Sequence, residues 1–376
     1  MAVGCWDRKE INDLAIVTGA GIHVSDDNEI EVSAQILAPS QVKSGGNSQN
    51  TQGASTLLWK ATGKDIADAV ENLQEKISRK TFWGQCEVFI ISEKLAEKGV
   101  QKQIDYLYRF PQIRERSFLY IFSGDPANIL KISPSLERNS SEVLRELSVL
   151  KTQVNVTLKE FESMLAGEAG AAMLPIITLP AYSREDKRER SPYVQGTAIF
   201  KRDKMTGRID HRSTNVILWL KNQAELENFT IKTTDETGYL SLRLLHVHTE
   251  YLPKIVKGIW KMAIHMTVES NIIHNGTKVN TMNPDFTKKI EEMTEKEMKK
   301  QIKQSIDIIQ KSLHADILGF ADAFHRKYPK KWAEVKHGWD ELYPKIEVEI
   351  HVNTKIRRPG MNRAPAGLPE GRVKKE

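Results

Sequence analysis

The fold of the C-terminal part is decided by Ile346-Glu347-Val348-Glu349-Ile350-His351-Val352-Asn353-Thr354-Lys355-Ile356, in which aliphatic and polar side chains alternate. Successive side chains of a strand point to opposite faces of a sheet, so this period of two predicts a strand with one packed and one solvated face. The apolar residues of 284–313 instead recur at helical spacing, which predicts one long helix. We expect the strand to pack under this helix.

The start of the long helix has its own signals. Asn283 is a suitable cap, Pro284 fits the first helical position, and Asp285 complements the helix dipole. At 1.5 Å per residue the helix would be on the order of 45 Å long. Its apolar stripe could line a groove for a cofactor or partner, but packing against a sheet is the simpler interpretation.

Toward the N-terminus, strand and helix patterns alternate, which favours a mixed sheet covered by helices. The expected strands are 14–18, 30–37, 88–91 and 118–122, and the expected helices are 64–79, 93–98 and 101–109. A second unit is expected from Pro134, with helix starts at Asn139 and Thr157, each followed three residues later by glutamate. It continues with an extended segment at 174–180 and with strands at 194–200 and 215–220 around a turn at 203–207. The third unit is expected to open with strands at 229–233, 239–249 and 261–270.

A chain of 376 residues is too long for one ordinary core. We therefore expect an α+β, or mixed α/β, fold with three sheet-and-helix domains. The predicted divisions are an N-terminal attachment segment at 1–5, domains at 6–133, 134–222 and 223–358, and a basic disordered tail at 359–376.

Composition narrows the class of protein. Hydrophobic residues make up 40% of the chain and charged residues 28%, as in a soluble globular protein. The net charge is +6, but 357–376 alone hold six basic and two acidic side chains. The nearly balanced remainder argues against a nucleic-acid-binding face. The tail is either a solvated end or a contact with anionic lipid. No apolar run approaches the ~18 residues that cross a bilayer.

No active-site motif is present: the chain has no P-loop, nucleophile elbow or zincin motif. Gly19-Ala20-Gly21 has two glycines of a dinucleotide loop, but no helix start follows it. His246 and His248 are two apart on an expected strand and could share a metal, yet no nearby Cys or acidic pair completes a site. The sequence therefore predicts no catalytic residue, no metal and no cofactor, and it favours binding or assembly over catalysis.

The two cysteines have different settings. Cys5 follows Gly4 near the N-terminus, where an acylated cysteine of a mature bacterial lipoprotein would lie, although an incidental buried cysteine is the alternative. Residues 1–4 are too short for a signal peptide, so an exported form would be mature or truncated. Cys86 lies in a strand-like run and is expected in the core.

An aromatic segment near the C-terminus offers a different kind of candidate. Trp332 and Trp339 follow Tyr328 among several lysines. Such rings could form a platform for a sugar or a protein partner, or they could anchor the long helix to the closing strand.

With these residues in view, the chain resembles the C-subunit lipoproteins of spore germinant receptors, the GerA-type C subunits of spore-forming Firmicutes. The likeness runs from Cys5 to about Gly360. It is carried by Gly4-Cys5-Trp6-Asp7 with Glu10-Ile11, Phe82-Trp83-Gly84, Ala315-Asp316-Ile317-Leu318-Gly319-Phe320, His325-Arg326-Lys327-Tyr328-Pro329-Lys330-Lys331-Trp332, Trp339 and Ile356-Arg357-Arg358-Pro359-Gly360.

The resemblance implies an elongated body of three mixed α/β domains, lipid-anchored through Cys5 on the outer face of the spore inner membrane. It implies partners, namely an A subunit and a multi-spanning B subunit, and a response to small nutrients, with no catalytic residue to carry over. One departure is Ala2, where a lipobox usually has leucine.

Three hypotheses follow, in this order. The first is a non-enzymatic, membrane-tethered receptor subunit. The second is an extracellular solute-binding lipoprotein that captures the nutrient itself through Tyr328, Trp332 and Trp339. The third is an enzyme that acts on the spore wall.

Overall fold

The computed structural model describes residues 10–38, 56–151, 153–180, 191–225, 227–233, 238–277, 281 and 283–358. The chain divides into two compact units. The first consists of Met1–Ala166 and Gly170–Arg208, and the second of Gly167–Ala169 and Ile209–Glu376. Cys5 and the basic tail at 359–376 lie outside the described residues.

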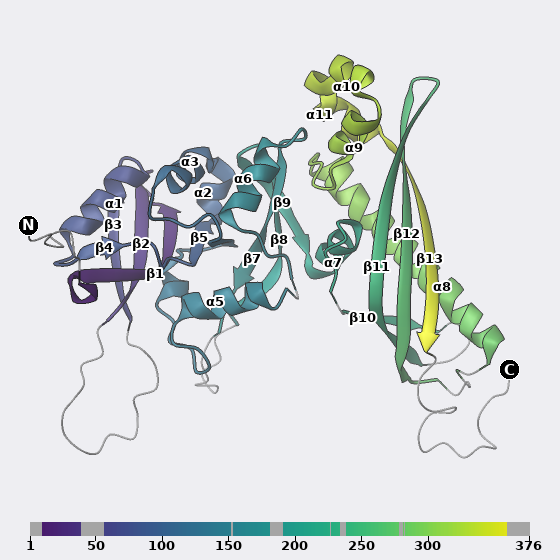
Figure 1. Ribbon diagram of the computed structural model, residues 1–376, viewed down its shortest axis with the longest axis horizontal. Helices are drawn as coiled ribbons and strands as arrows, with labels where there is room; N and C mark the ends of the chain where they lie inside the picture. The colour runs from purple at the N-terminus through teal and green to yellow at the C-terminus, as the bar shows by residue number, and fades with distance from the viewer. Residues whose placement is uncertain are drawn as a thin grey trace, which may run out of the picture. The chain divides into compact units, whose positions relative to one another are not determined.

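The first unit is built on a nine-stranded sheet of order β3-β2-β1-β5-β6-β7-β8-β9, with β4 paired to β1 (Figure 1). Its centre is parallel, since β5 pairs with β1 and β6, and β6 pairs with β7, in parallel register. The strands are β1 (Leu14–Val24), β2 (Ile30–Leu37), β3 (Thr56–Gly63), β4 (Lys80–Phe82), β5 (Val88–Ser92), β6 (Phe118–Phe122), β7 (Ala171–Thr178), β8 (Tyr193–Lys201) and β9 (Lys204–Asp210).

Helices accompany this sheet, as the alternation in the sequence predicts. They are the short η1 (Ile11–Asp13) and α1 (Ile66–Glu75), α2 (Glu93–Lys98), α3 (Gln101–Arg109), α4 (Ala127–Leu130), α5 (Ser140–Val149) and α6 (Leu158–Ala166). Every residue of β5 is buried, which explains its uninterrupted apolar run. The predicted helix starts are confirmed: the Asn139 side chain accepts a hydrogen bond from the Glu142 N–H, and the Thr157 hydroxyl accepts one from the Glu160 N–H.

The glycines of Gly19-Ala20-Gly21 lie inside β1 rather than in a phosphate loop. A Cβ added to Gly19 would lie 2.9 Å from Cβ of Ser141, and one added to Gly21 would lie 2.5 Å from Cβ of Pro126. The two glycines therefore let the segment of Pro126 and helix α5 approach the strand closely.

The second unit holds a four-stranded sheet of order β10-β11-β12-β13. Its strands are β10 (Glu227–Lys232), β11 (Tyr239–Val256), β12 (Ile259–Asn275) and β13 (Glu347–Arg358). Its helical segments are α7 (His211–Leu220), α8 (Pro284–Asp307), the π-helical η2 (Ile308–Ser312), α9 (Phe320–Lys327), α10 (Pro329–Val335), η3 (Lys336–Gly338), α11 (Trp339–Leu342) and η4 (Tyr343–Lys345).

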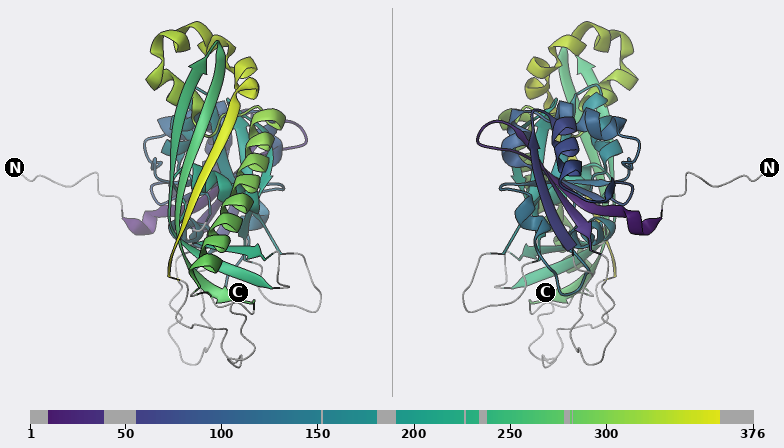
Figure 2. Two further views of the ribbon diagram at one scale, coloured as in Figure 1. Left: turned by 90° about the vertical axis from the view of Figure 1, so that its right-hand side faces the viewer. Right: turned by 90° about the vertical axis from the view of Figure 1, so that its left-hand side faces the viewer.

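The predicted long helix and closing strand are both confirmed, and α8 runs alongside β13 (Figure 2). Strand β13 is parallel to β12 and forms the edge of the sheet. The backbone N–H groups of Thr354 and Ile356 donate to the carboxylates of Glu295 and Glu291 on α8, at 2.9 and 2.8 Å. The helix thus satisfies donors that an edge strand would otherwise leave open to another chain.

Two local predictions are wrong. Residues 215–220 belong to helix α7, because Asp210 caps its first turn at 2.8 Å from the Ser213 N–H and nearly the whole helix is buried. A helix buried on all sides has no polar stripe, so its apolar run looks like a buried strand. The expected turn at 203–207 lies mostly within β9, because Arg202, with φ of 56°, reverses the chain earlier.

The α+β fold class is confirmed, since both units combine a sheet with helices. The expected boundary at 133/134 falls between β6 and β7, which pair within one sheet. The division between the two units falls near 208/209, before the expected boundary at 222/223. The three-domain division stays a prediction.

Candidate functional site

The two cysteines differ in what the structure says of them. Cys5 lies outside the described residues, so its role stays a prediction. Cys86 is free and fully buried, and burial raises the pKa of its thiol far above the ordinary value. Such a thiol is a core residue, in agreement with the sequence.

Two of the three predicted aromatic residues, Trp332 and Trp339, lie in one cluster of the second unit with Trp260, Phe320, Phe324 and Tyr343. Trp332 and Trp339 are only 2% and 4% exposed, and their ring centroids are 4.9 Å apart. Tyr328, between α9 and α10, is partly exposed. The packing favours the structural alternative for the two tryptophans, and the partner or ligand surface stays a prediction.

A buried carboxylate organises this aromatic cluster. Asp316 accepts hydrogen bonds from the backbone N–H groups of Phe320 and Ala321, at 2.9 and 2.7 Å, and from the indole N–H of Trp339 at 3.2 Å. These bonds join the start of α9 to α11. Burial raises the pKa of Asp316 to about 6, while the same hydrogen bonds oppose the rise. Sequence reasoning assigned no role to Asp316, although an acidic residue within an apolar run is a signal that could have identified it.

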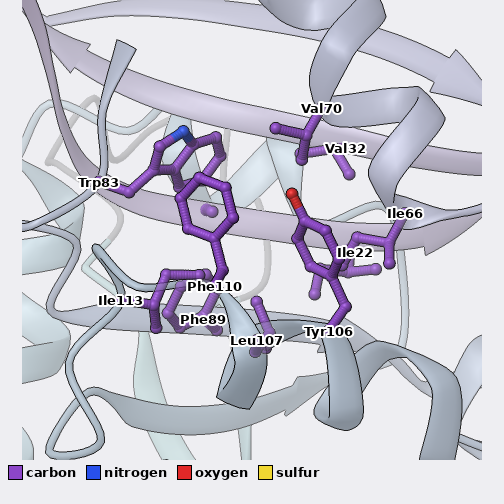
Figure 3. A pocket seen from close by; sticks show the side chains of 11 residues that line it. Ile22, Val32, Ile66, Val70, Trp83, Phe89, Tyr106, Leu107, Phe110 and Ile113 are labelled. Atoms are coloured by element: carbon purple, nitrogen blue, oxygen red, sulfur yellow. The ribbon is translucent and has the colours of Figure 1, made fainter.

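A small apolar cavity lies in the first unit, among Trp83, Tyr106, Phe110 and neighbouring aliphatic side chains (Figure 3). Its volume of about 10 Å³ is close to the least that holds one water molecule. Trp83 is buried, and its indole N–H has no hydrogen-bond partner among the described residues. The Phe82-Trp83-Gly84 motif therefore contributes to the core, and the cavity beside it has room for about one water molecule.

A larger polar cleft of about 280 Å³ also lies in the first unit. We define the polar cleft by Thr18, Glu87, Arg138, Asn139, Glu142 and Arg145, which are among its lining residues. Thr18 comes from β1 and Glu87 precedes β5, while Arg138, Asn139 and Glu142 lie at or near the start of α5 and Arg145 lies in the middle of that helix.

Charges of both signs are ordered in the polar cleft. The Arg138 guanidinium donates hydrogen bonds to both carboxylate oxygens of Glu142, the shortest to each at 2.6 and 3.0 Å, and this contact holds the pKa of Glu142 below its usual range. Arg145 Nε lies 3.4 Å from a carboxylate oxygen of Glu87 and is buried without a hydrogen bond to any described residue, while another nitrogen of the same guanidinium binds Glu146. The cleft thus presents two guanidinium and two carboxylate groups to one small space.

A buried network supports the wall of the polar cleft. The side chain of Gln35 accepts from the Ser141 hydroxyl at 2.6 Å and donates to the Leu130 carbonyl at 2.7 Å and to the Ser140 hydroxyl at 3.0 Å. These contacts fix the start of α5 against β2. A cleft on rigid elements with satisfied polar support is typical of a preorganised binding site, and the same network holds the helix in place.

His246 and His248 lie on β11 with their rings stacked at 6.3 Å. In the ranges that the structure describes, no three His, Cys, Asp or Glu side chains are grouped to hold a metal ion. Among the same residues, no helix combines the length and the apolar character needed to cross a membrane.

Comparison with known proteins places this geometry in a family. Residues 7–179 match the model described as the spore germination protein N-terminal domain, and residues 195–360 match the model described as spore germination B3/GerAC like, C-terminal. The putative spore germination protein YfkR of Bacillus subtilis (strain 168) is 27% identical over 96% of this chain and 94% of its own. Spore germination protein KC of the same strain is 26% identical over 96% and 93%. Spore germination protein GerQC of Bacillus cereus is 23% identical over 96% of each chain.

A solved structure agrees with the fold. The crystal structure of the GerBC protein matches with a TM-score of 0.59 at 17% identity, covering 90% of this chain and 97% of that one. The matched models and relatives define the class as spore germination proteins. The chain belongs to the GerAC family, and its resemblance to germinant receptor C subunits is confirmed.

Proposed function

We propose that this protein is a non-enzymatic subunit of a nutrient germinant receptor, anchored by lipid on Cys5. The observation that carries the proposal is the match of both halves of the chain to spore germination models, with relatives aligned over nearly their whole length. The proposed place is the outer face of the spore inner membrane, beside an A subunit and a multi-spanning B subunit.

Replacing Cys5 with alanine in the full-length gene tests the tether. We expect the protein to leave the membrane fraction of spores and nutrient germination to fall, because the acylated thiol is the proposed attachment. Cys86→Ala is the matched control, since Cys86 is buried in the core and should not affect attachment. Unchanged fractionation and germination of the Cys5 variant would contradict the proposal.

The partners have a separate test. Tagged protein extracted from spore membranes should co-purify with an A and a B subunit, identified by mass spectrometry. Isolation of the protein without either subunit would count against a receptor complex.

A second candidate function, capture of the nutrient by this subunit, is favoured by the polar cleft. Its two carboxylates and two guanidinium groups suit a small solute with charges of both signs or with several hydroxyl groups. In this form of the hypothesis the ligand contacts Arg145 and Glu87 rather than the buried tryptophans.

Calorimetry of the isolated chain with amino acids and sugars tests solute capture. If a solute binds, Arg145→Ala should weaken binding by about tenfold or more, because it removes a charged partner in the polar cleft. Arg109→Ala is the matched control, since Arg109 is an exposed arginine paired with Asp105 within α3. Absence of binding by the unaltered chain would favour a subunit that does not capture the nutrient.

A further inference from the structure

The turn between β11 and β12 is a tight hairpin of the second unit. Lys257 and Gly258 have φ of 51° and 83°, as a two-residue turn of type I′ requires. A Cβ added to Gly258 would meet no atom within 4 Å, so the turn stands open. Figure 1 shows it at the same end of this unit as α9, α10 and α11.

The hairpin is held rigidly a short way behind its turn. Trp260 is buried and packs with its ring centroid 4.6 Å from that of Phe324 and 6.2 Å from that of Trp339. This packing fixes the position of the two strands next to the turn.

The end of the hairpin is apolar and exposed. Val256 and Ile259 are partners across the two strands and are 48% and 47% exposed. Two residues further from the turn on the same face lie Lys254 and Lys261, also directly opposite each other. Like charges in this position oppose strand pairing.

One of the two lysines, Lys261, is paired with acidic residues of the neighbouring strand β13. Glu347 and Glu349 lie 2.7 and 4.0 Å from Lys261 Nζ. The chain between Glu250 and Glu269 has three lysines and no acidic residue. Near the same end, the exposed Arg326, Lys327 and Lys330 add positive charge.

We infer that this hairpin end binds the surface of an anionic lipid bilayer. Val256 and Ile259 enter the boundary between headgroups and acyl chains, while Lys254 and Lys257 reach anionic phosphates beside them. An apolar end flanked by lysines is complementary to such a surface, because the apolar side chains contact the acyl-chain boundary while the lysines contact the anionic headgroups. The inference rests on the proposed function in one respect, namely that the protein lies at a membrane in the spore.

Sedimentation of the full chain with vesicles tests this site without the tether. The protein should carry Cys5→Ser, so that it cannot be acylated, and the vesicles should be phosphatidylglycerol mixed with phosphatidylcholine, or phosphatidylcholine alone. We expect binding to the mixed vesicles that weakens with added salt. Val256→Ser with Ile259→Ser should reduce it by about tenfold, and Lys254→Gln with Lys257→Gln by about fivefold per lysine.

Matched controls exist on the same unit. Leu245→Ser with Ile273→Ser changes two similarly exposed aliphatic residues of β11 and β12 that lie away from the turn, and Lys288→Gln with Lys303→Gln changes two exposed lysines of α8. Both controls should bind vesicles as the parent does, and unchanged thermal unfolding will show that every variant is folded.

Three results would overturn the inference: no vesicle binding by the parent chain, equal binding to neutral vesicles, or equal losses in the controls. Failure of the parent to bind, together with loss of receptor co-purification by the Val256 and Ile259 variant, would assign the hairpin end to a protein partner instead. The vesicle test uses a chain that cannot be acylated, so its failure leaves the proposed tether on Cys5 standing, and failure of the Cys5→Ala test leaves the vesicle result standing.

Discussion

Replacing Trp339 with alanine is expected to lower the free energy of unfolding of the second unit by about 3–5 kcal/mol. The ring of Trp339 contacts those of Trp260, Phe324, Trp332 and Tyr343, at centroid distances between 4.9 and 6.2 Å. Its removal leaves a cavity among these rings, and the surrounding helices can collapse into it only in part.

The loss is larger than a transfer energy alone, because the indole N–H also binds the buried Asp316. Urea unfolding, with hydrogen exchange of α9 to α11 to identify the unit, measures the change. Trp59→Ala on β3 is the matched control; Trp59 is 36% exposed, so we expect a loss of about 1 kcal/mol or less. Equal losses at the two positions would contradict the structural role given to Trp339.

The second large effect is a dependence of stability on pH that Asp316 alone produces. Burial raises its pKa from 3.8 to about 6 in the folded protein. The folded state then binds the proton more tightly than the unfolded state, so this contribution is fully present below pH 3.8 and is lost as pH rises to 6. The expected loss is about 3 kcal/mol.

Asp316→Asn removes the titration while keeping the size of the side chain. The difference in unfolding free energy between parent and variant should therefore shift by about 2 kcal/mol against the parent from pH 4 to pH 7. Comparison with the variant cancels other carboxylates, such as Glu142, whose lowered pKa acts in the opposite direction. A difference that moves in favour of the parent as pH rises would mean that the three N–H donors outweigh burial.

The elements with a strong period could be predicted from sequence, and those without one could not. Helix α8 and strand β13 each bury one face only. Apolar residues therefore recur every three to four positions in α8 and at every second position in β13, and both repeats are visible in the sequence. Helix α7 buries nearly its whole surface and loses the pattern that marks a helix. The caps at Asn139 and Thr157 were predictable because they depend on residues three positions apart.

The candidate sites show the same limit. Trp332 and Trp339 could be found as unusual residues, but their burial depends on Trp260, which comes from a distant strand. The polar cleft joins Thr18, Glu87 and Arg145, which become neighbours only because β1 pairs with β5 and α5 lies beside them. No short sequence motif indicates that these distant residues become neighbours in the fold.

The parallel pairing of β13 with β12 has a consequence for biosynthesis. Lys261 of β12 faces Glu347 of β13, and α8 to η4 are made between them. While the ribosome is still translating this interval, Glu291 and Glu295 lack the N–H donors of β13 that they bind in the folded protein. The apolar side of α8 also lacks the completed sheet against which it packs. The chain between β12 and β13 loses conformational entropy when this long loop closes, before the stabilising contacts between the two strands can form. Parallel pairing of this kind is therefore slow. The second unit therefore completes its fold only after its last strand, β13, has been translated. Until then the newly made second unit stays incompletely folded.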